Sequence, residues 1–121
     1  MAILGILSFG YARDSMAVRA AVLRQAGYRV EEAHSPAQCL ESIKSDAIDV
    51  VLLCHSVPKA EAQLLVSLIR EQRVLLPILC VSSSDHAAAP EGCIRASNAP
   101  IPLVNSLRNA IRKPPTPPGA P

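Results

Sequence analysis

Residues 48–58 have the sequence Ile48-Asp49-Val50-Val51-Leu52-Leu53-Cys54-His55-Ser56-Val57-Pro58. Apolar side chains fill its first half, an acidic residue stands before the Val-Leu run, and a proline ends the segment. A short, continuous Val- and Leu-rich run of this kind is typical of a parallel strand that is covered on both faces. Open α/β sheets place their chemistry just beyond the carboxyl ends of such strands. We therefore expect a buried strand that presents the thiol of Cys54 at the functional edge of a sheet.

The rest of the chain alternates between strand and helix patterns around this segment. Strands are expected at residues 2–9, 28–33, 49–54, 77–82 and 93–97, and helices at 14–26, from Pro36, after Lys59 and from Leu103. In the first helix, Asp14 or Ser15 is the expected cap, Gly27 ends the helix, and one face is formed by Val18, Ala21, Val22 and Ala26. Residues 83–91 are small and polar and contain Pro90, so a fourth helix there should be short. Strict alternation predicts an α/β fold of three layers, with helices on both faces of a five-stranded parallel sheet.

Composition limits the classes of function. A chain of 121 residues, half of them apolar, favours one domain, expected at residues 1–113. Residues 114–121 are proline-rich and are expected to form a disordered, solvated tail, with a proline-recognition ligand as the alternative. A net charge of +2 with scattered basic residues argues against a nucleic-acid partner. The apolar amino terminus lacks a basic region and is too short to span a membrane, so we expect a cytoplasmic protein.

The cysteines and histidines show no metal-ligand spacing. The four cysteines lie 13 to 26 residues apart without a CxxC pair, and the three histidines are also widely separated: Cys39, Cys54, Cys80, Cys93, His34, His55 and His86. We therefore expect no metal, no cofactor and no disulfide framework. Cys39 and Cys80 have apolar neighbours and are expected to be inert, buried thiols.

Several segments, taken in order, resemble the receiver domain of bacterial two-component response regulators over residues 2–112. They are Ala26-Gly27-Tyr28-Arg29-Val30, Ala33-His34-Ser35-Pro36-Ala37-Gln38-Cys39-Leu40, Asp49-Val50-Val51-Leu52-Leu53 with Val57-Pro58, and Pro77-Ile78-Leu79-Cys80-Val81-Ser82. The resemblance implies a flavodoxin-like (βα)5 fold with strand order 2-1-3-4-5. It also implies that the fourth helix is shortened, because only ten positions separate Ser82 from Gly92.

The family's chemistry needs an acidic pair that holds Mg²⁺, an acceptor aspartate, a Ser or Thr, and a Lys before a proline. In this sequence the corresponding positions hold Gly10 and Tyr11 (or, counted from the strand, Ser8 and Phe9), Cys54, Ser82 and Ala99. Only the serine fits, and Mg²⁺ prefers carboxylate oxygens. The resemblance therefore implies a degenerate receiver with no catalytic residues, no enzymatic activity and no aspartyl-phosphate chemistry.

The leading hypothesis is a stand-alone protein–protein interaction module in bacterial signalling, whose partner is a second copy or another signalling protein. The resemblance places the contact surface on the last strand and helix, with candidate residues Ile94, Arg95, Leu103, Leu107, Arg108 and Arg112. A second hypothesis is a redox or covalent sensor that uses Cys54. An enzyme that uses the strand-end crevice is disfavoured, because the sequence shows no set of nucleophile, base and orienting residue.

Overall fold

The structure of the protein is a computed structural model that describes residues 4–45, 47–54, 56–82, 94–97 and 100–112. Side chains are described for all of these except residues 82, 94–97, 100–102 and 110–112. The elements are β1 (Gly5–Phe9), α1 (Arg13–Gln25), β2 (Arg29–Ala33), α2 (Pro36–Ser42), β3 (Val50–Leu53), α3 (Lys59–Gln72), β4 (Ile78–Ser82), β5 (Ile94–Ser97) and α4 (Pro100–Arg112). None of the helices described is long and apolar enough to cross a membrane.

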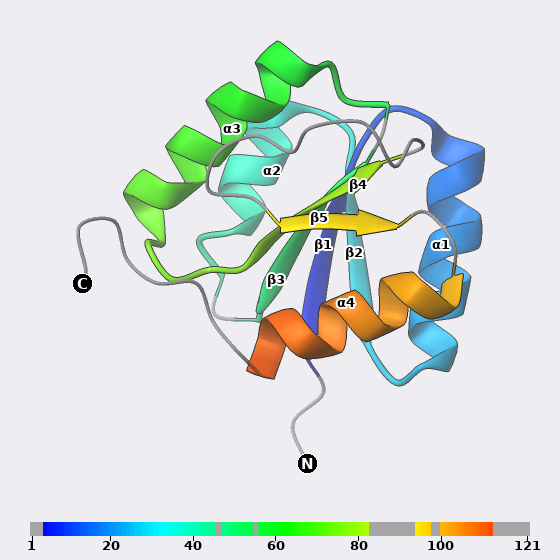
Figure 1. Ribbon diagram of the computed structural model, residues 1–121. Coiled ribbons are helices and arrows are strands. Elements are labelled where there is room, and N and C mark those ends of the chain that lie inside the picture. Colours follow the sequence, from blue (N-terminus) through cyan, green and yellow to red (C-terminus); the bar gives the residue numbers. More distant parts are fainter. Residues whose placement is uncertain (1–3, 46, 55, 83–93, 98–99, 113–121) are drawn as a thin grey trace.

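The strands form one parallel sheet in the order β2-β1-β3-β4-β5 (Figure 1). β3 lies at the centre, where Ile6–Phe9 of β1 pair with Val50–Leu53 and Cys80 of β4 pairs with Leu53. The predicted flavodoxin-like arrangement, with strand order 2-1-3-4, is confirmed. The predicted short fourth helix falls on residues 83–91 and the predicted tail on residues 114–121, and both lie outside the described residues.

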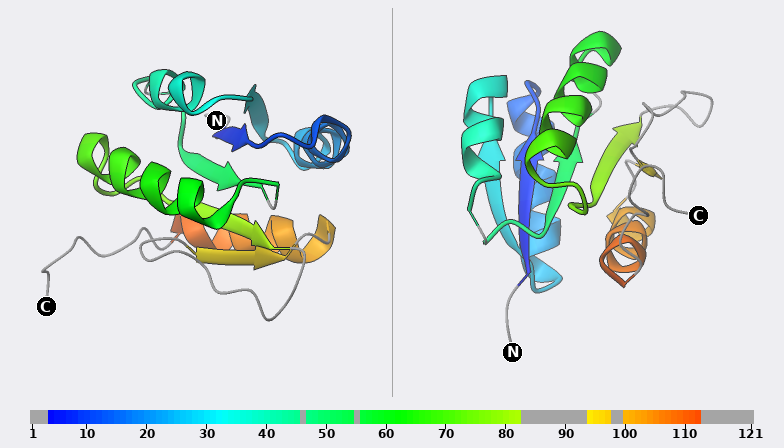
Figure 2. Two further views of the ribbon diagram at one scale, coloured as in Figure 1. Left: turned by 90° about the horizontal axis from the view of Figure 1, so that it is seen from above. Right: turned by 90° about the vertical axis from the view of Figure 1, so that its left-hand side faces the viewer.

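Helices cover both faces of the sheet, with α2 and α3 on one side and α1 and α4 on the other (Figure 2). Strand alternation divides the apolar side chains between the two sides: Leu7 and Phe9 pack with α2 and α3, whereas Ile6 packs with α1 and α4. All four residues of β3 are buried, as the opening segment predicts for a strand covered on both faces.

The sequence correctly predicts where α2 begins and where α1 ends. Ser35 Oγ accepts a hydrogen bond of 3.1 Å from the Gln38 amide, and Pro36 is the first residue of α2. Gly27 follows α1 with a φ of 98°, the left-handed conformation that glycine adopts without strain. The structure confirms both predictions.

Two predictions for the first helix are wrong. Its N-cap residue is Ala12, and no side chain caps the helix. The Ala12 amide donates a hydrogen bond to Ser56 Oγ, in the loop after β3. Its buried residues are Met16, Arg19, Ala20 and Leu23, while Val18 is 66% exposed. Apolar residues occur on both sides of this helix, and the longer side chains face the sheet.

The cysteines differ from one another more than expected. Cys39 and Cys54 are free and buried. Cys80, half-buried on β4, is disulfide-bonded. The expectations that Cys80 is an inert buried thiol and that the cysteines form no disulfide are therefore wrong, because the sequence neighbours of a cysteine do not show which distant segments the fold brings alongside its strand, as it brings β5 alongside β4.

Candidate functional site

The candidate site lies where β1 and β3 end side by side. Gly10 follows β1 and Cys54 follows β3, and the Cys54 amide donates a 2.9 Å hydrogen bond to the Phe9 carbonyl oxygen. A Cβ atom on Gly10 would lie 2.7 Å from Cys54 Cβ, 3.0 Å from Ser56 Oγ and 3.2 Å from Met16 Sδ. The structure thus brings two of the predicted site positions together, and leaves no room for a side chain at the first.

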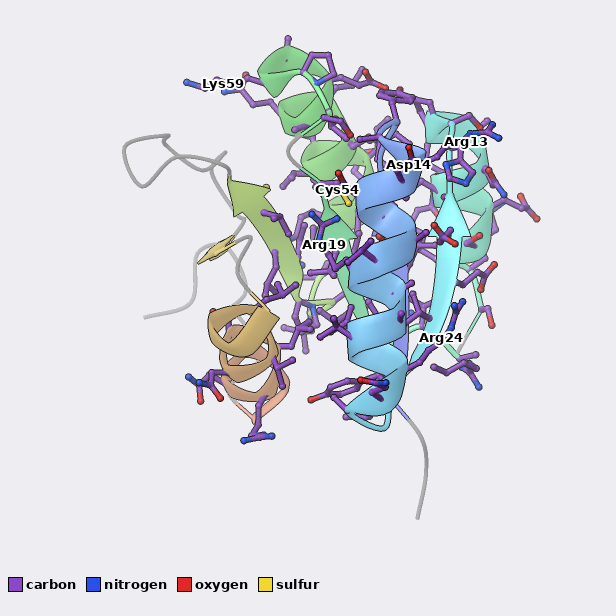
Figure 3. All side chains as sticks on the ribbon, turned by 90° about the vertical axis from the view of Figure 1, so that its right-hand side faces the viewer. Arg13, Asp14, Arg19, Arg24, Cys54 and Lys59 are labelled. Atoms are coloured by element: carbon purple, nitrogen blue, oxygen red, sulfur yellow. The ribbon has the colours of Figure 1, made fainter. Side chains whose placement is uncertain are left out.

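The Cys54 thiol is buried in a small polar cluster beneath α1. Its side chain is only 3% exposed, and Sγ accepts a 3.0 Å hydrogen bond from Arg19 Nη1. Ser8 Oγ lies 3.5 Å from the same sulfur atom. Figure 3 shows Arg19 reaching from α1 toward Cys54 across the face of the sheet. This edge of the sheet therefore contains a guanidinium, a thiol and a hydroxyl.

The charge state of this cluster follows from its burial. Burial raises the pKa of the Cys54 thiol, and the more distant Glu32 carboxylate raises it further. The hydrogen bond to Ser8 and the Arg19 guanidinium lower the pKa, but burial has the larger effect. Cys54 is therefore a neutral thiol near pH 7, and a neutral thiol is a poor nucleophile.

Ser56 ties the loop after β3 to the loop after β1. Its Oγ accepts hydrogen bonds from the amides of Tyr11 (2.9 Å) and Ala12 (3.2 Å). These amides lie at and before the N-cap of α1, so the serine fixes the chain that enters the helix, while the helix itself has no side-chain cap. Sequence reasoning missed this residue, because a side chain that bonds amides about 45 positions away leaves no local pattern.

Tyr11 lies over the edge of the sheet beside these loops. Its hydroxyl donates to Glu61 Oε1 of α3, a bond that raises the pKa of Tyr11 to about 12. Its ring meets the Phe9 ring edge-on, with 5.5 Å between the ring centroids. Tyr11 is 42% exposed, so it does not fill a buried pocket. It closes the sheet edge from the solvent side.

The residues at this edge do not fit Mg²⁺. Asp14 is exposed in the first turn of α1, and the Glu61 carboxylate is engaged by Tyr11. Within the described ranges, no group of three His, Cys, Asp or Glu side chains could hold a metal ion. A hard cation needs several oxygen ligands, and these side chains do not provide them.

The remaining predicted site positions are Ser82 and Ala99. Ser82 ends β4 and pairs with Ser97 of β5, but its side chain and the whole of Ala99 lie outside the description. Tyr11 and Cys54 are therefore described side chains of the predicted set, as are Ser8 and Phe9 from the alternative count along β1.

The predicted contact surface on α4 needs a correction. Leu103 and Leu107 are 1% and 0% exposed, because they pack against β1, β3 and β4 in the core. Arg108 is exposed, whereas Ile94, Arg95 and Arg112 have no described side chains. Over residues 103–109, where the side chains of this helix are described, the leucines face the sheet and the exposed side chains are polar.

The fold is similar to that of solved receiver domains. A putative response regulator from Chloroflexus aurantiacus J-10-fl is 21% identical with a TM-score of 0.78, covering 93% of this chain and 100% of that one. A CheY-like receiver domain protein from Methanospirillum hungatei JF-1 is 16% identical with a TM-score of 0.77, covering 93% and 96%. The response regulator TrrA from Thermotoga maritima, solved in complex with Mg²⁺ and BeF, is 17% identical with a TM-score of 0.74, covering 88% and 98%.

No protein-family model matches the chain, and no curated protein sequence is significantly similar to it. The structural similarity, at these identities, shows the CheY-like fold.

Proposed function

We propose that this chain is a receiver-like domain that cannot be phosphorylated and that acts as a protein–protein interaction module in bacterial signalling. One observation carries the first part: the neutral thiol of Cys54 stands at the end of β3, and the adjacent Gly10 has no room for a side chain. Transfer of a phosphoryl group to a receiver needs a carboxylate nucleophile and a bound Mg²⁺. The described residues at the sheet edge supply neither a carboxylate at the end of β3 nor a set of metal ligands.

The interaction role rests on the surface that the fold leaves available. On α4, Asn105, Arg108 and Asn109 are exposed, while Leu103 holds the helix on the sheet. A rigidly held helix with a polar, positively charged outer face can present one constant surface to a partner. We place the contact on β5 and the outward face of α4, with a second copy or another cytoplasmic signalling protein as the partner.

Incubation with acetyl phosphate and Mg²⁺ should leave the mass of the intact protein unchanged. The same result is expected for the Cys54→Asp variant, because the acceptor carboxylate alone does not recreate the metal ligands that Gly10 and Tyr11 lack. Intact mass spectrometry checks both proteins. An acid-labile gain of one phosphoryl group in the parent would contradict the proposal. The same gain in the variant alone would mean that another set of residues holds the metal.

Light scattering over a concentration series tests the contact surface. If the partner is a second copy, the parent should dimerise, and Arg108→Glu should weaken the dimer at least about tenfold through a changed charge at the interface. Arg13→Glu, an equal charge reversal at an exposed position of α1, is the matched control and should not affect dimerisation. A parent that stays monomeric at every concentration would contradict the homodimer, as would equal effects of the two variants.

The cysteine sensor is the second candidate, and the short distance between Arg19 Nη1 and Cys54 Sγ is the observation in its favour. Burial opposes it, since the thiol is nearly inaccessible and its pKa is raised. We expect iodoacetamide at pH 7.5 to alkylate Cys54 at least about 100-fold more slowly than in the urea-unfolded chain.

Cys39 is the internal reference for this measurement. It is also free and buried, and burial raises its pKa to about 12. Peptide mapping should therefore find both thiols protected to a similar degree. Selective and rapid labelling of Cys54 at neutral pH would instead favour the sensor.

A further inference from the structure

A hollow of about 430 Å³ opens at the edge of the sheet opposite the candidate site, where the strands begin. It lies between the end of α3 and the starts of β3 and β4, and it is lined by Asp49, Arg73, Val74, Leu75, Leu76 and Pro77. None of these residues takes part in the proposed function.

The walls of the hollow are fixed by hydrogen bonds. Arg73 Nη1 donates to the carbonyl oxygens of Ile48 (2.7 Å) and Ser45 (3.3 Å), which holds the α3–β4 connection against the chain that enters β3. Asp49 Oδ2 accepts a 2.7 Å hydrogen bond from the Gly5 amide. The hollow is therefore a formed feature of the fold and does not depend on a loose loop.

The lip of the hollow is apolar and exposed. Val74 and Leu75 are 46% and 52% exposed, and they are the only adjacent pair among the large apolar side chains exposed in the described part of the chain. Single exposed apolar residues are ordinary, whereas neighbouring ones at the rim of a cavity are typical of a surface that another segment covers.

The last helix ends on the side of the molecule where this hollow opens. α4 runs back across the sheet. Its end and the α3–β4 connection both lie toward the lower left of Figure 1. In the right-hand view of Figure 2 the two again lie on the side that faces the viewer. Nine residues follow Arg112, and five of the last eight are prolines. At the ~3.1 Å rise per residue of polyproline II, this segment can reach roughly 28 Å.

We propose that residues 113–121 dock into this hollow on their own molecule, with proline rings against Val74 and Leu75. A proline-rich segment is already extended, so it loses little conformational entropy when it binds an apolar surface. The charges of Asp49 and Arg73 in the wall offset each other, so the apolar contacts with Val74 and Leu75 carry the docking. Docking would restrain a tail that the sequence alone predicts to be solvated.

The amides of Thr116, Gly119 and Ala120 report on the docking, because the prolines around them have no amide hydrogen. In the full-length ¹⁵N-labelled protein, their NMR order parameters should exceed about 0.6, and they should fall into the flexible range in Leu75→Asp. Leu64→Asp is the matched control, because Leu64 is 60% exposed on α3 and lies outside the hollow. It should leave the three amides as they are in the parent.

Each outcome decides the proposal. Ordered amides in the parent and in Leu64→Asp, lost only in Leu75→Asp, support docking. Flexible amides in the parent overturn it without reference to any variant and restore the solvated tail. Order that disappears when the protein is diluted would assign the hollow to the tail of a second copy and would also overturn docking within one molecule.

Discussion

Gly10→Asp, the substitution that would begin to rebuild an acidic pair, should lower the free energy of unfolding by at least about 2 kcal/mol. The new Cβ would lie 2.7 Å from Cys54 Cβ, a separation that side chains do not tolerate, and the Cys54 backbone is fixed by its hydrogen bond to Phe9. The carboxylate would also enter a region in which Gly10 is buried. Urea denaturation monitored by circular dichroism measures the change.

Ala12→Asp is the control for this experiment. It adds the same charge two positions farther on, at the N-cap of α1, where aspartate is a favoured residue. We expect stability equal to that of the parent or higher by up to about 1 kcal/mol. If Gly10→Asp were as stable as the parent and bound Mg²⁺ in a titration, the sheet edge would be able to open, and the argument against phosphorylation would fail.

The lack of space at Gly10 blocks receiver chemistry more firmly than the missing carboxylates alone would. A site that had merely lost its acids could regain them by substitution. Here Gly10, Cys54 and Ser56 have come close enough together that the volume needed by an acidic side chain is already occupied. Reactivation would require changes on both loops at once, so we expect no single substitution to restore receiver chemistry.

Much of the fold could be predicted because its signals are local. The buried run at residues 50–53, the Ser35-Pro36 helix start and Gly27 each determine a structure within a few residues, and all three appear as predicted. The faces of the helices were harder to predict. α1 carries apolar residues on two faces, and the sequence does not show which face packs on the sheet. The side chains of the sheet determine that Met16 is buried and Val18 is exposed.

The candidate site was only partly visible in the sequence. Strand register places Gly10 beside Cys54, and this follows from parallel pairing of two strands that were both predicted. Arg19 was missed because a charged residue on a helix is expected to face solvent. The signal that could have found it is its spacing from Met16 and Leu23, which puts it on the stripe that packs against the sheet.

Arg19→Met and Cys54→Asp, combined in a double-mutant cycle, should show a coupling energy of about 3 kcal/mol. In the parent, Arg19 Nη1 donates to a neutral thiol, so the methionine variant loses a modest hydrogen bond. In Cys54→Asp, the same guanidinium would face a buried carboxylate. Its removal would then leave that charge unpaired, at a cost of about 3–5 kcal/mol. Urea denaturation of the four proteins gives the coupling energy directly.

Arg24→Met provides the matched control, because Arg24 lies on the same helix but donates to the carbonyl oxygen of Val30, away from Cys54. Its coupling with Cys54→Asp should be zero within about 0.5 kcal/mol. The Arg19 coupling should also shrink at low pH, since protonation of the aspartate removes the charge that the guanidinium stabilises. Additive effects of Arg19→Met and Cys54→Asp at pH 7 would show that the guanidinium does not reach the end of β3. The electrostatic account of this edge would then be wrong, while the steric one would stand.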